Sequence, residues 1–563
     1  MRGLKVSQMT FRASVNLAFV LVLLGAGAVA GCGDDGASDP EDAAIGTPDG
    51  AVDASLPDAV ADAADDGGAA VDPRFDPLMD AIERDLAAST ATAVSVAVWM
   101  DDQVMYVGGF GTRDPNGGLP PDEDTFFMIG SDTKKIAAIT LLQRIAAGDL
   151  MPDTTIAEVL PELRLGFAAP YLQASAHDLL SQQGGVLDYT GGLRAMTSDA
   201  ELRNIVFGEF AQRAYSMNPP GVFFNYSNPN FSMAGLLAEA AAAEPWADLA
   251  EARVFAPLGM TRSVARRSAV DENHSTGVGF ATNMDRTPAP VALDDTWENA
   301  FVRPAGLVWS TPSDQMRLAE FLVDGNDAVL SSDLREALVE RHTPIAPDLP
   351  GHYGYGLFVY DGLTLGADYY EGVETWIHGG ATFTHTSLFM VLPEERFAIS
   401  ILANGVGADF GPSAEVAMRT LVDLPAPGAA PVPPFVAEEL DALVGTYTDP
   451  FNVGDVIVSR EGDNLRLSMP ALDMAGIAYL PMMTPVSTRA WRANIQMSPI
   501  VLFFYDGPDG ETYLANRAFV ATRPAVSPNA FRPLPADRTP SRAAIDALVA
   551  RIERPALLPS VLR

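Results

Sequence analysis

The clearest chemical signal in this sequence is a serine, Ser131, that stands three residues before a lysine, Lys134. The chain has 36 Lys and Arg residues, yet its lysines are only Lys5, Lys134 and Lys135. Arginine stays protonated, whereas a desolvated lysine can lose its proton and act as a base. Residues three apart on a helix share one face, so this hydroxyl and this amine can meet. The spacing predicts a nucleophilic serine with a lysine base.

Each residue of this pair also has a simpler interpretation. Ser131 alone fits the N-cap of the helix that follows it. At that position it would also lie near free backbone N–H groups, which favour developing negative charge. Lys135 is expected to be a surface cation on the same helix. The choice between chemistry and capping depends on motifs elsewhere in the chain.

Two later segments carry polar residues that can complete such a site. PPGVFFNYSNPNFSMAGLLAEAA contains Tyr226 and Asn228, and ETWIHGGAT contains His378, Gly380 and Ala381. Taken singly, the tyrosine fits a buried or interface side chain and the histidine a hydrogen-bonded core residue. Together with FFMIGSDTKKIAAITLLQRIAAGDL, these segments resemble the three motifs, in order, of the serine β-lactamase and penicillin-binding-protein superfamily. The resemblance covers about residues 78 to 420.

The resemblance implies a role for the residues of the first two motifs. Ser131 would be the acylated nucleophile, and Lys134 the base that activates it. Tyr226 would pass a proton to the leaving group and help to activate water for deacylation. Asn228 would hydrogen-bond the substrate and Lys134.

The third motif would form one wall of the cleft. The resemblance implies that His378 orients Tyr226 or the substrate, and that the strand through Gly380 and Ala381 lines the substrate. The backbone N–H groups of Ser131 and Ala381 would form the oxyanion hole. A histidine at the start of this motif, where some branches have Lys-Thr-Gly, points to the class C-like, carboxypeptidase and esterase branches.

The sequence also departs from the pattern of the family and excludes other chemistries. Many relatives have His-Thr-Ser-Gly where this chain has Gln182 to Gly185, a stretch that is structural in the family. The remaining histidines show no metal-ligand spacing and there is no His-Glu-x-x-His stretch, so no metal and no cofactor are predicted. No Gly-x-Ser-x-Gly elbow is present, which argues against an α/β-hydrolase triad.

The elements that must position these residues follow the order strands, helices, strands. Runs at 93–100 and 103–110 predict a hairpin, and 354–360, 387–392 and 397–403 predict later strands. Between them the helical pattern covers 136–180, 231–243 and 247–255, with an amphipathic helix from Lys135 onward. This order predicts an α+β fold, an antiparallel sheet with a helical subdomain, over a hydrolase domain at 75–423.

A second domain is expected after a proline-rich linker at 424–436. Short alternating runs at 443–448, 456–460, 465–469 and 500–505 predict a small antiparallel β domain over 437–525. It resembles an accessory domain often appended to this family. The tail at 526–563 is left unassigned.

The N-terminal region predicts export and anchoring. A basic start and a short apolar run end at Cys32, the only cysteine of the chain, and residues 1–32 resemble a bacterial lipoprotein signal with lipidated Cys32. The alternative is an ordinary signal peptide with an incidental cysteine. Residues 33–74 are acidic, without Lys or Arg up to Pro73, and predict a disordered tether. The expected location is the bacterial cell envelope, outside the cytoplasm, with membrane contact only through the lipid.

Charge and motifs together limit the function. A net charge of −37 argues against nucleic acid and anionic lipid surfaces as partners. The motifs predict a serine hydrolase that acts through an acyl-serine intermediate on an ester, amide, lactam or D-amino-acid peptide bond, in a small-molecule or peptidoglycan-type substrate. The alternatives are an inactive family member that binds peptidoglycan or another envelope partner, and a metallohydrolase. The sequence sets no oligomeric state.

Overall fold

The computed structural model describes residues 72–190, 195–280, 287–496, 498–525, 540 and 542–552. The predicted signal segment with Cys32, and all of the predicted tether before residue 72, lie outside these described residues. Among the helices of the described ranges, none is both long and apolar enough to cross a membrane.

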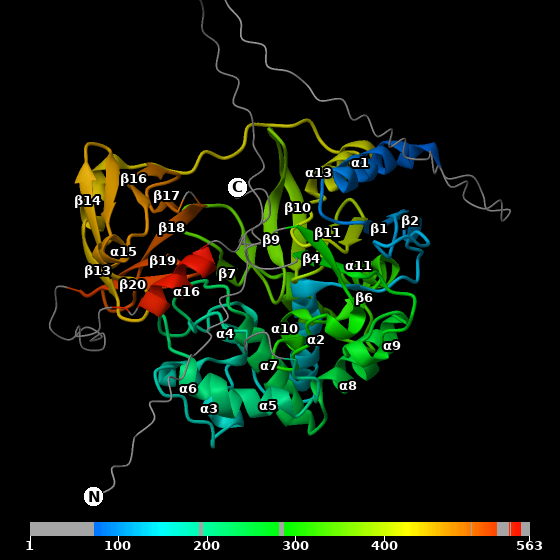
Figure 1. Ribbon diagram of the computed structural model, residues 1–563, viewed down its shortest axis with the longest axis horizontal. Helices are drawn as coiled ribbons and strands as arrows, with labels where there is room; N and C mark the ends of the chain where they lie inside the picture. Colours follow the sequence, from blue (N-terminus) through cyan, green and yellow to red (C-terminus); the bar gives the residue numbers. More distant parts are fainter. Residues whose placement is uncertain are drawn as a thin grey trace, which may run out of the picture.

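An eight-stranded antiparallel sheet forms the centre of the larger domain (Figure 1). Its order is β2-β1-β12-β11-β10-β9-β8-β7. The strands are β1 (Ala93–Met100), β2 (Gln103–Gly111), β7 (Thr343–Pro344), β8 (His352–Tyr353), β9 (Phe358–Leu365), β10 (Asp368–Ala381), β11 (Thr386–Leu392) and β12 (Phe397–Ala403). β1 therefore pairs with β12, the last strand of the sheet in chain order, so the two ends of the larger domain meet in its centre.

The predicted hairpin is present as β1 and β2. Asp101 and Asp102 form its turn with φ of 53° and 62°, and two such left-handed residues match the twist of the flanking strands. Every residue of β1 and β12 is buried, because helices cover both faces. Helix α11 (Pro312–Asp324) packs against β1 and β12, whereas α1 (Asp76–Ala87) and α13 (Gly411–Leu421) pack together on the opposite face (Figure 1).

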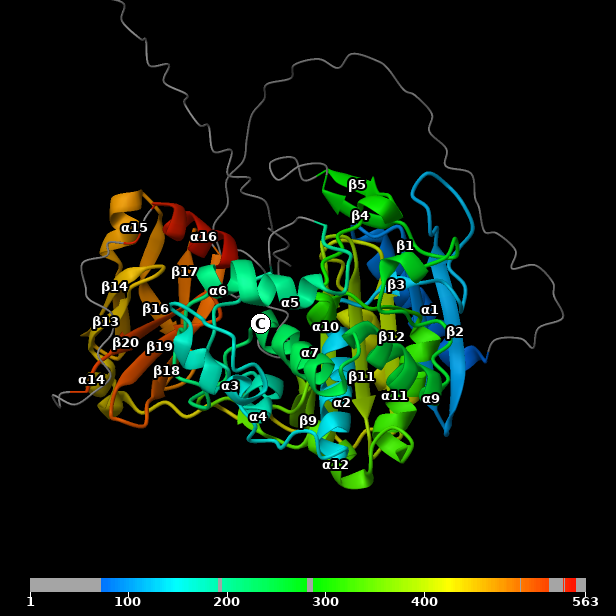
Figure 2. The same cartoon turned by 90° about the horizontal axis from the view of Figure 1, so that it is seen from below.

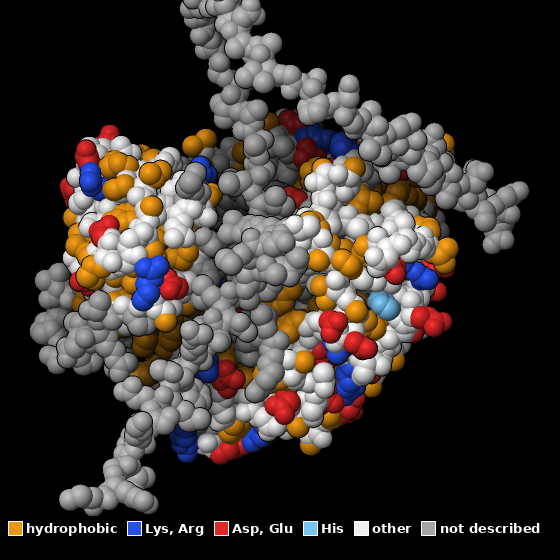
Figure 3. All heavy atoms as spheres, viewed as in Figure 1, with side chains coloured by type: hydrophobic (Ala, Val, Ile, Leu, Met, Phe, Trp, Pro, Cys, Tyr) orange, Lys and Arg blue, Asp and Glu red, His pale blue; other side chains and the backbone are white. Residues whose placement is uncertain are grey.

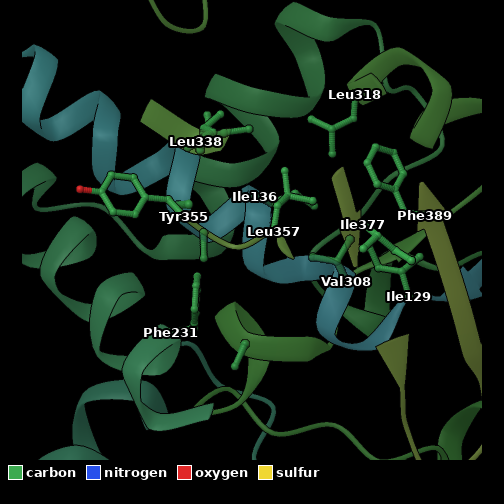
Figure 4. Packing of buried hydrophobic residues seen from close by; sticks show 14 of the residues in the cluster. Ile129, Ile136, Phe231, Val308, Leu318, Leu338, Tyr355, Leu357, Ile377 and Phe389 are labelled. Carbon is green, nitrogen blue, oxygen red and sulfur yellow. The ribbon is translucent and has the colours of Figure 1, made fainter. Parts of the chain in front are cut away.

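The helical part between β2 and β7 surrounds α2 (Thr133–Ala146). Residues Thr133 to Gln143 are all buried, so this helix is central rather than amphipathic as predicted. Besides α11, the other helices of this part are α3 (Ile156–Val159), α4 (Ala176–Leu180), α5 (Glu201–Ile205), α6 (Ala211–Arg213), α7 (Asn228–Ala242), α8 (Trp246–Ala250), α9 (Ala256–Leu258), α10 (Arg303–Gly306) and α12 (Ser332–Val339). Figure 4 shows Ile136 of α2 among apolar side chains of α7, α12 and the segment before β9.

Two small two-stranded sheets complete the larger domain. β3 (Phe127–Met128), directly before the serine, pairs with β6 (Trp309–Ser310). β4 (Gly277–Phe280) pairs with β5 (Pro288–Val291). The β3–β6 pair connects the segment before Ser131 to the chain that follows α10.

The C-terminal domain is a closed barrel of antiparallel strands. Its strands are β13 (Gly445–Asp449), β14 (Gly454–Glu461), β15 (Asn464–Ser468), β16 (Tyr479–Pro485), β17 (Ala490–Ile495), β18 (Ser498–Asp506), β19 (Thr512–Asn516) and β20 (Phe519–Arg523), with α14 (Leu440–Leu443) and α15 (Pro470–Ala475) beside them. The predicted antiparallel β domain is therefore present, with more strands than the sequence indicated. Helix α16 (Arg542–Ile552), in the tail left unassigned, packs Ile545 and Leu548 into the barrel core.

An apolar interface joins the barrel to the helical part of the larger domain, next to α4 and α6 (Figures 1 and 2). Tyr215 stacks on Phe451 with ring centroids 4.1 Å apart, and Phe223 stacks on Tyr505 at 4.2 Å. The hydroxyl of Tyr215 donates to Asn452 Oδ1 at 2.6 Å. Stacked aromatic rings with a satisfied polar tip fix the relative position of two surfaces, so the barrel is docked at this interface.

Charged side chains on the face seen in Figure 3 are interspersed rather than gathered by sign. Acidic and basic groups lie side by side over the helices of the larger domain, with apolar side chains between them.

Candidate active site

Ser131 lies in a 3-10 turn, Gly130–Asp132, that leads directly into α2. Gly130 has a φ of +54°, and a Cβ at this position would lie 2.6 Å from the backbone nitrogen of Ala381. Only glycine combines this left-handed backbone with such a close approach. The turn therefore holds Ser131 against the end of β10.

Lys134, in the first turn of α2, is fully buried, and its amine lies within hydrogen-bond distance of three oxygen atoms. Its Nζ lies 3.1 Å from Ser131 Oγ, 2.8 Å from Asn228 Oδ1 and 2.6 Å from the carbonyl oxygen of Ala305. Asn228 is the first residue of α7 and Ala305 belongs to α10. The predicted serine–lysine pair and Asn228 are thus brought together, and the carbonyl of Ala305 is a partner that the sequence did not indicate.

The surroundings of Lys134 favour its uncharged form. Burial holds the pKa of its amine well below the ordinary value, and the guanidinium of Arg517 lowers it further. Asp188 and Asp132 act in the opposite direction. A lysine whose pKa is depressed by desolvation can accept a proton near neutral pH.

Tyr226 lies beside this lysine, with its ring 4.9 Å from Lys134 Nζ and 4.5 Å from Arg517 Cζ. Its hydroxyl is buried and makes no well-aligned hydrogen bond to any residue that the structure describes. Burial raises the pKa of the phenol, while Arg517 and the neighbouring hydroxyl of Ser131 lower it. The phenol is therefore protonated and lies beside the hydroxyl of Ser131.

His378 is fully buried on β10 behind Tyr226, with ring centroids 6.3 Å apart. Its Nδ1 lies 2.7 Å from the carbonyl oxygen of Gly379, and its Nε2 lies 3.3 Å from the hydroxyl of Tyr353. Burial lowers its pKa well below the ordinary value, so the neutral ring donates to the carbonyl and accepts from the tyrosine. This arrangement suits a hydrogen-bonded core histidine, and the predicted role of orienting Tyr226 stays a prediction.

Gly380 and Ala381 end β10 beside the turn Gly130–Asp132, which we call the nucleophile turn because Ser131 is the predicted nucleophile. A Cβ at Gly380 would lie 1.9 Å from the carbonyl oxygen of Ile129, so the strand and the turn approach at backbone distance. Ala381 pairs with Thr386 of β11 and is exposed. The predicted oxyanion donors, the N–H groups of Ser131 and Ala381, therefore come from two segments that touch.

Two charged residues that sequence analysis missed complete the site. Asp188 Oδ1 accepts from the backbone nitrogen and from Nδ2 of Asn228, at 3.0 and 3.1 Å. Asp188 Oδ2 accepts from Nε and Nη2 of Arg517, at 3.1 and 2.6 Å. Asp188 lies in a loop after α4, and Arg517 lies in the barrel. Neither residue stands in a motif, so only the fold reveals them.

The stretch that begins at Gln182 positions the segment that carries Asn228. Gln182 has a φ of 61°, and its Oε1 accepts from the backbone nitrogen of Ser227 at 2.9 Å and from Asn230 Nδ2 at 2.7 Å. These bonds hold both ends of the segment that contains Asn228. The departure from the pattern of the family thus falls at a residue that supports the second motif.

The prediction that Lys135 is a surface cation is wrong. Lys135 is fully buried, with its Nζ 2.9 Å from Asp132 Oδ1 and 3.6 Å from the ring centroid of Phe389. Asp132 Oδ2 also accepts from the hydroxyl of Ser387 at 2.5 Å. Because α2 is enclosed on all sides, neither lysine can reach solvent, and Lys135 takes a carboxylate and an aromatic face instead.

No group of His, Cys, Asp and Glu suited to a metal ion occurs within the described ranges.

Known proteins resemble this chain over much of its length. A family model described as Beta-lactamase matches residues 78–422. The chain is 26% identical over 380 residues to penicillin-binding protein 4 of Amycolatopsis lactamdurans, covering 63% of this chain and 92% of that protein. It is 30% identical over 234 residues to esterase EstB of Burkholderia gladioli, covering 39% and 57%.

The fold is also similar to that of a solved structure. The octameric penicillin-binding protein homologue from Pyrococcus abyssi superposes with a TM-score of 0.53 and 19% identity. The alignment covers 79% of this chain and 99% of that one, so the likeness extends beyond the larger domain.

Proposed function

Since the chain belongs to the β-lactamase family and is a serine hydrolase of the β-lactamase-related type, we propose that it works through an acyl-enzyme formed on Ser131. The substrate would carry an ester, amide, lactam or D-amino-acid peptide bond. The observation that carries this proposal is the buried amine of Lys134, 3.1 Å from Ser131 Oγ. A desolvated amine at this distance is placed to remove the proton of the hydroxyl.

The other contacts of Lys134 support its role as the base. A neutral amine has two N–H groups and one lone pair, whereas an ammonium has three N–H groups and no acceptor. Asn228 Oδ1 and the carbonyl of Ala305 can accept only, and they take the two N–H groups. The lone pair is then left for the O–H of Ser131.

The remaining steps follow from the positions of the neighbours. Attack of Ser131 Oγ on the carbonyl carbon would place negative charge on the carbonyl oxygen, next to the N–H groups of Ser131 and Ala381. The protonated phenol of Tyr226 would supply a proton to the leaving group. Water would then attack the acyl-serine, with Lys134 and Tyr226 moving the protons in reverse.

An inactive binding protein would have no use for this lysine. Burying an uncharged amine disfavours folding near neutral pH, because the unfolded chain carries the same amine protonated. A scaffold that only binds could replace it with an apolar residue. The retained serine, lysine and tyrosine therefore favour the catalytic function over the binding alternative.

Labelling with a fluorescent fluorophosphonate tests the proposal directly. Wild type should label, and Ser131→Ala should not. Lys134→Arg should lose labelling by roughly 10²–10⁴-fold, because arginine stays protonated and cannot act as the base. Equal labelling of wild type and Ser131→Ala would overturn the proposal. Ser313→Ala, a serine on α11, is the matched control.

Substrate class is tested with a panel chosen from the same chemistry. Penicillin-binding and esterase names among the relatives motivate nitrocefin, a D-Ala-D-Ala peptide and short-chain p-nitrophenyl esters. The proposal expects turnover of at least one of these probes that disappears in Ser131→Ala. Turnover that survives the substitution would assign the activity to another group.

We also propose that Cys32 is lipidated and anchors the hydrolase in a bacterial cell envelope. The support is its position directly after the apolar run of a basic N-terminal segment. Wild type should partition with membranes and incorporate radiolabelled palmitate, and Cys32→Ser should do neither. Membrane partitioning that is unchanged in Cys32→Ser would contradict this proposal.

A further inference from the structure

A turn of the barrel reaches into the site of the other domain. Strands β19 and β20 pair Asn516 with Phe519, so their turn consists of Arg517 and Ala518. The guanidinium of Arg517 lies 4.5 Å from the ring centroid of Tyr226, and its side chain is only 28% exposed. A charge this enclosed needs fixed partners.

Arg517 begins a chain of hydrogen bonds that ends at the nucleophile. It donates twice to Asp188 Oδ2, and Asp188 Oδ1 accepts from the backbone and the side-chain nitrogen of Asn228. Because Asn228 Nδ2 is held by Asp188, its Oδ1 faces Lys134, from which it accepts a bond at 2.8 Å. Lys134 in turn reaches Ser131.

The hairpin that presents Arg517 is itself clamped to the larger domain. Tyr513 and Ala515 of β19 and Val520 of β20 are buried in the interface cluster with Leu187 and Phe223. Leu187 directly precedes Asp188, so the same contact positions both members of the ion pair. Arg517 is therefore held in the site by packing on both of its flanking strands.

We propose that Arg517 is a positioning residue of the acyl-transfer site, supplied by the barrel to fix Asp188 and the Asn228 amide and so to set Lys134. The inference rests on the proposed function of Lys134 as the base. Without the barrel, Asp188 would lose its counter-charge, and the amide of Asn228 would lose its fixed orientation.

The charges around Lys134 determine the direction in which its pKa should change when Arg517 or Asp188 is replaced. The groups that face it are Arg517 of the barrel, Asp188 of the loop, Asp132 of the nucleophile turn, and the neutral Tyr226 and His378. Arg517 lowers the pKa of Lys134, whereas Asp188 and Asp132 raise it. Removing the guanidinium should therefore raise the pKa of Lys134, and removing the carboxylate of Asp188 should lower it.

Lysine-selective ¹³C NMR on the full chain can measure this, because the chain has only three lysines. The signal of Lys134 is assigned by its loss in Lys134→Arg. Arg517→Gln keeps N–H donors for Asp188 and removes the charge, so it is expected to fold. We expect the pKa of Lys134 to rise in Arg517→Gln, to return towards wild type in Arg517→Lys, and to fall in Asp188→Asn.

Arg492→Gln is the matched control, since this arginine of β17 is exposed. It removes the same charge from the same barrel and should leave the titration of Lys134 unchanged. A folded Arg517→Gln protein that titrates Lys134 as wild type does would overturn the inference. So would an equal shift in Arg492→Gln.

Fluorophosphonate labelling provides the second measurement. At a pH on the rising limb, Arg517→Gln should label on the order of tenfold more slowly than wild type, because Lys134 is both more protonated and less well oriented. Arg517→Gln that labels at the wild-type rate over the whole pH range would overturn the inference. Failure of wild type itself to label would defeat the proposed function, and the NMR titration would still decide the role of Arg517.

Discussion

At the scale of single residues, the buried Lys134 ties activity to a cost in stability. Its depressed pKa means that the unfolded chain binds one proton more than the native chain between the folded pKa and about 10.4. In that range the free energy of unfolding increases with pH on account of this group. The base is active on the high-pH side of the folded pKa, so acylation should increase with pH and level off well below pH 10.

Lys134→Met tests this balance. We expect the variant to be inactive. We also expect its thermal unfolding midpoint, compared with that of wild type at the same pH, to be higher near neutral pH than above about pH 10. The reason is that methionine has no proton to lose on folding. Calorimetry across this pH range measures the difference, and a difference that does not vary with pH would contradict the assignment of an uncharged lysine.

For Lys135 we expect a different result, because its amine is paired with the carboxylate of Asp132. Removing one member of a buried ion pair costs about 3–5 kcal/mol, since the other charge is left uncompensated. Lys135→Met should therefore destabilise the protein by that amount, measured by urea unfolding. Arg466→Ala removes a cation from an exposed pair with Glu461 and should cost at most about 1 kcal/mol. Similar losses in the two variants would contradict the buried pair.

Sequence analysis found the site residues that stand in local motifs. The spacing predicted Ser131 and Lys134, and the resemblance of a longer segment to a family motif predicted Tyr226 and Asn228. The structure places Lys134 within hydrogen-bond distance of Ser131 and Asn228 and beside the ring of Tyr226. Asp188 and Arg517 are 329 positions apart, and no motif connects them. Lys135 was misjudged because residue type alone does not tell whether a helix has a solvent face.

At the scale of elements, the site depends on how closely the nucleophile turn and β10 approach. Gly130 needs a left-handed backbone and has no room for a Cβ. Gly130→Ala should destabilise the protein by about 1–3 kcal/mol through backbone strain and also reduce fluorophosphonate labelling strongly, since it moves Ser131 away from Ala381.

Gly148→Ala separates strain from displacement. Gly148 follows α2 with a φ of +78° and nothing within 4 Å of its Cβ position. This variant should lose stability through the same backbone strain, but it should label at the wild-type rate. Labelling that survives in Gly130→Ala would show that the close approach does not position the nucleophile.

Most long elements were predictable because their patterns are strong. The predicted runs at 93–100, 387–392 and 397–403 differ from β1, β11 and β12 by at most one residue at an end. The β7, β8, β3 and β6 strands, of two residues each, have too short a pattern to be recognised. The predicted helical region up to 180 contains α2 followed only by short helices, of which α3 and α4 pack against α7.

At the scale of the whole molecule, the barrel domain is docked on the larger domain and contributes Arg517 to the proposed site. Phe223→Ala deletes an aromatic ring that stacks on Tyr505 in the interface and should cost about 3–5 kcal/mol. It should also slow fluorophosphonate labelling, because Arg517 would lose its fixed position. Unfolding midpoints and limited proteolysis at the 424–436 segment measure the undocking.

Leu480→Ala is the control for that variant, since Leu480 of β16 is 61% exposed. It should leave both the unfolding midpoint and the labelling rate unchanged. A Phe223→Ala protein that labels at the wild-type rate after its linker has become cleavable would show that the barrel does not contribute to the site. The sequence predicted the β domain but not its closure, because closure depends on the pairing of β13 with β20 at the two ends of the domain.

The burial of both lysines of α2 also determines which chemical reagents and proteases can modify the folded protein. Among the described residues, both lysines are buried, so this surface presents no lysine amine. Succinimidyl esters and amine-directed cross-linkers should therefore leave the side chains of the folded body unmodified. An endoproteinase specific for lysine should likewise leave the folded body uncut, while trypsin still finds exposed arginines.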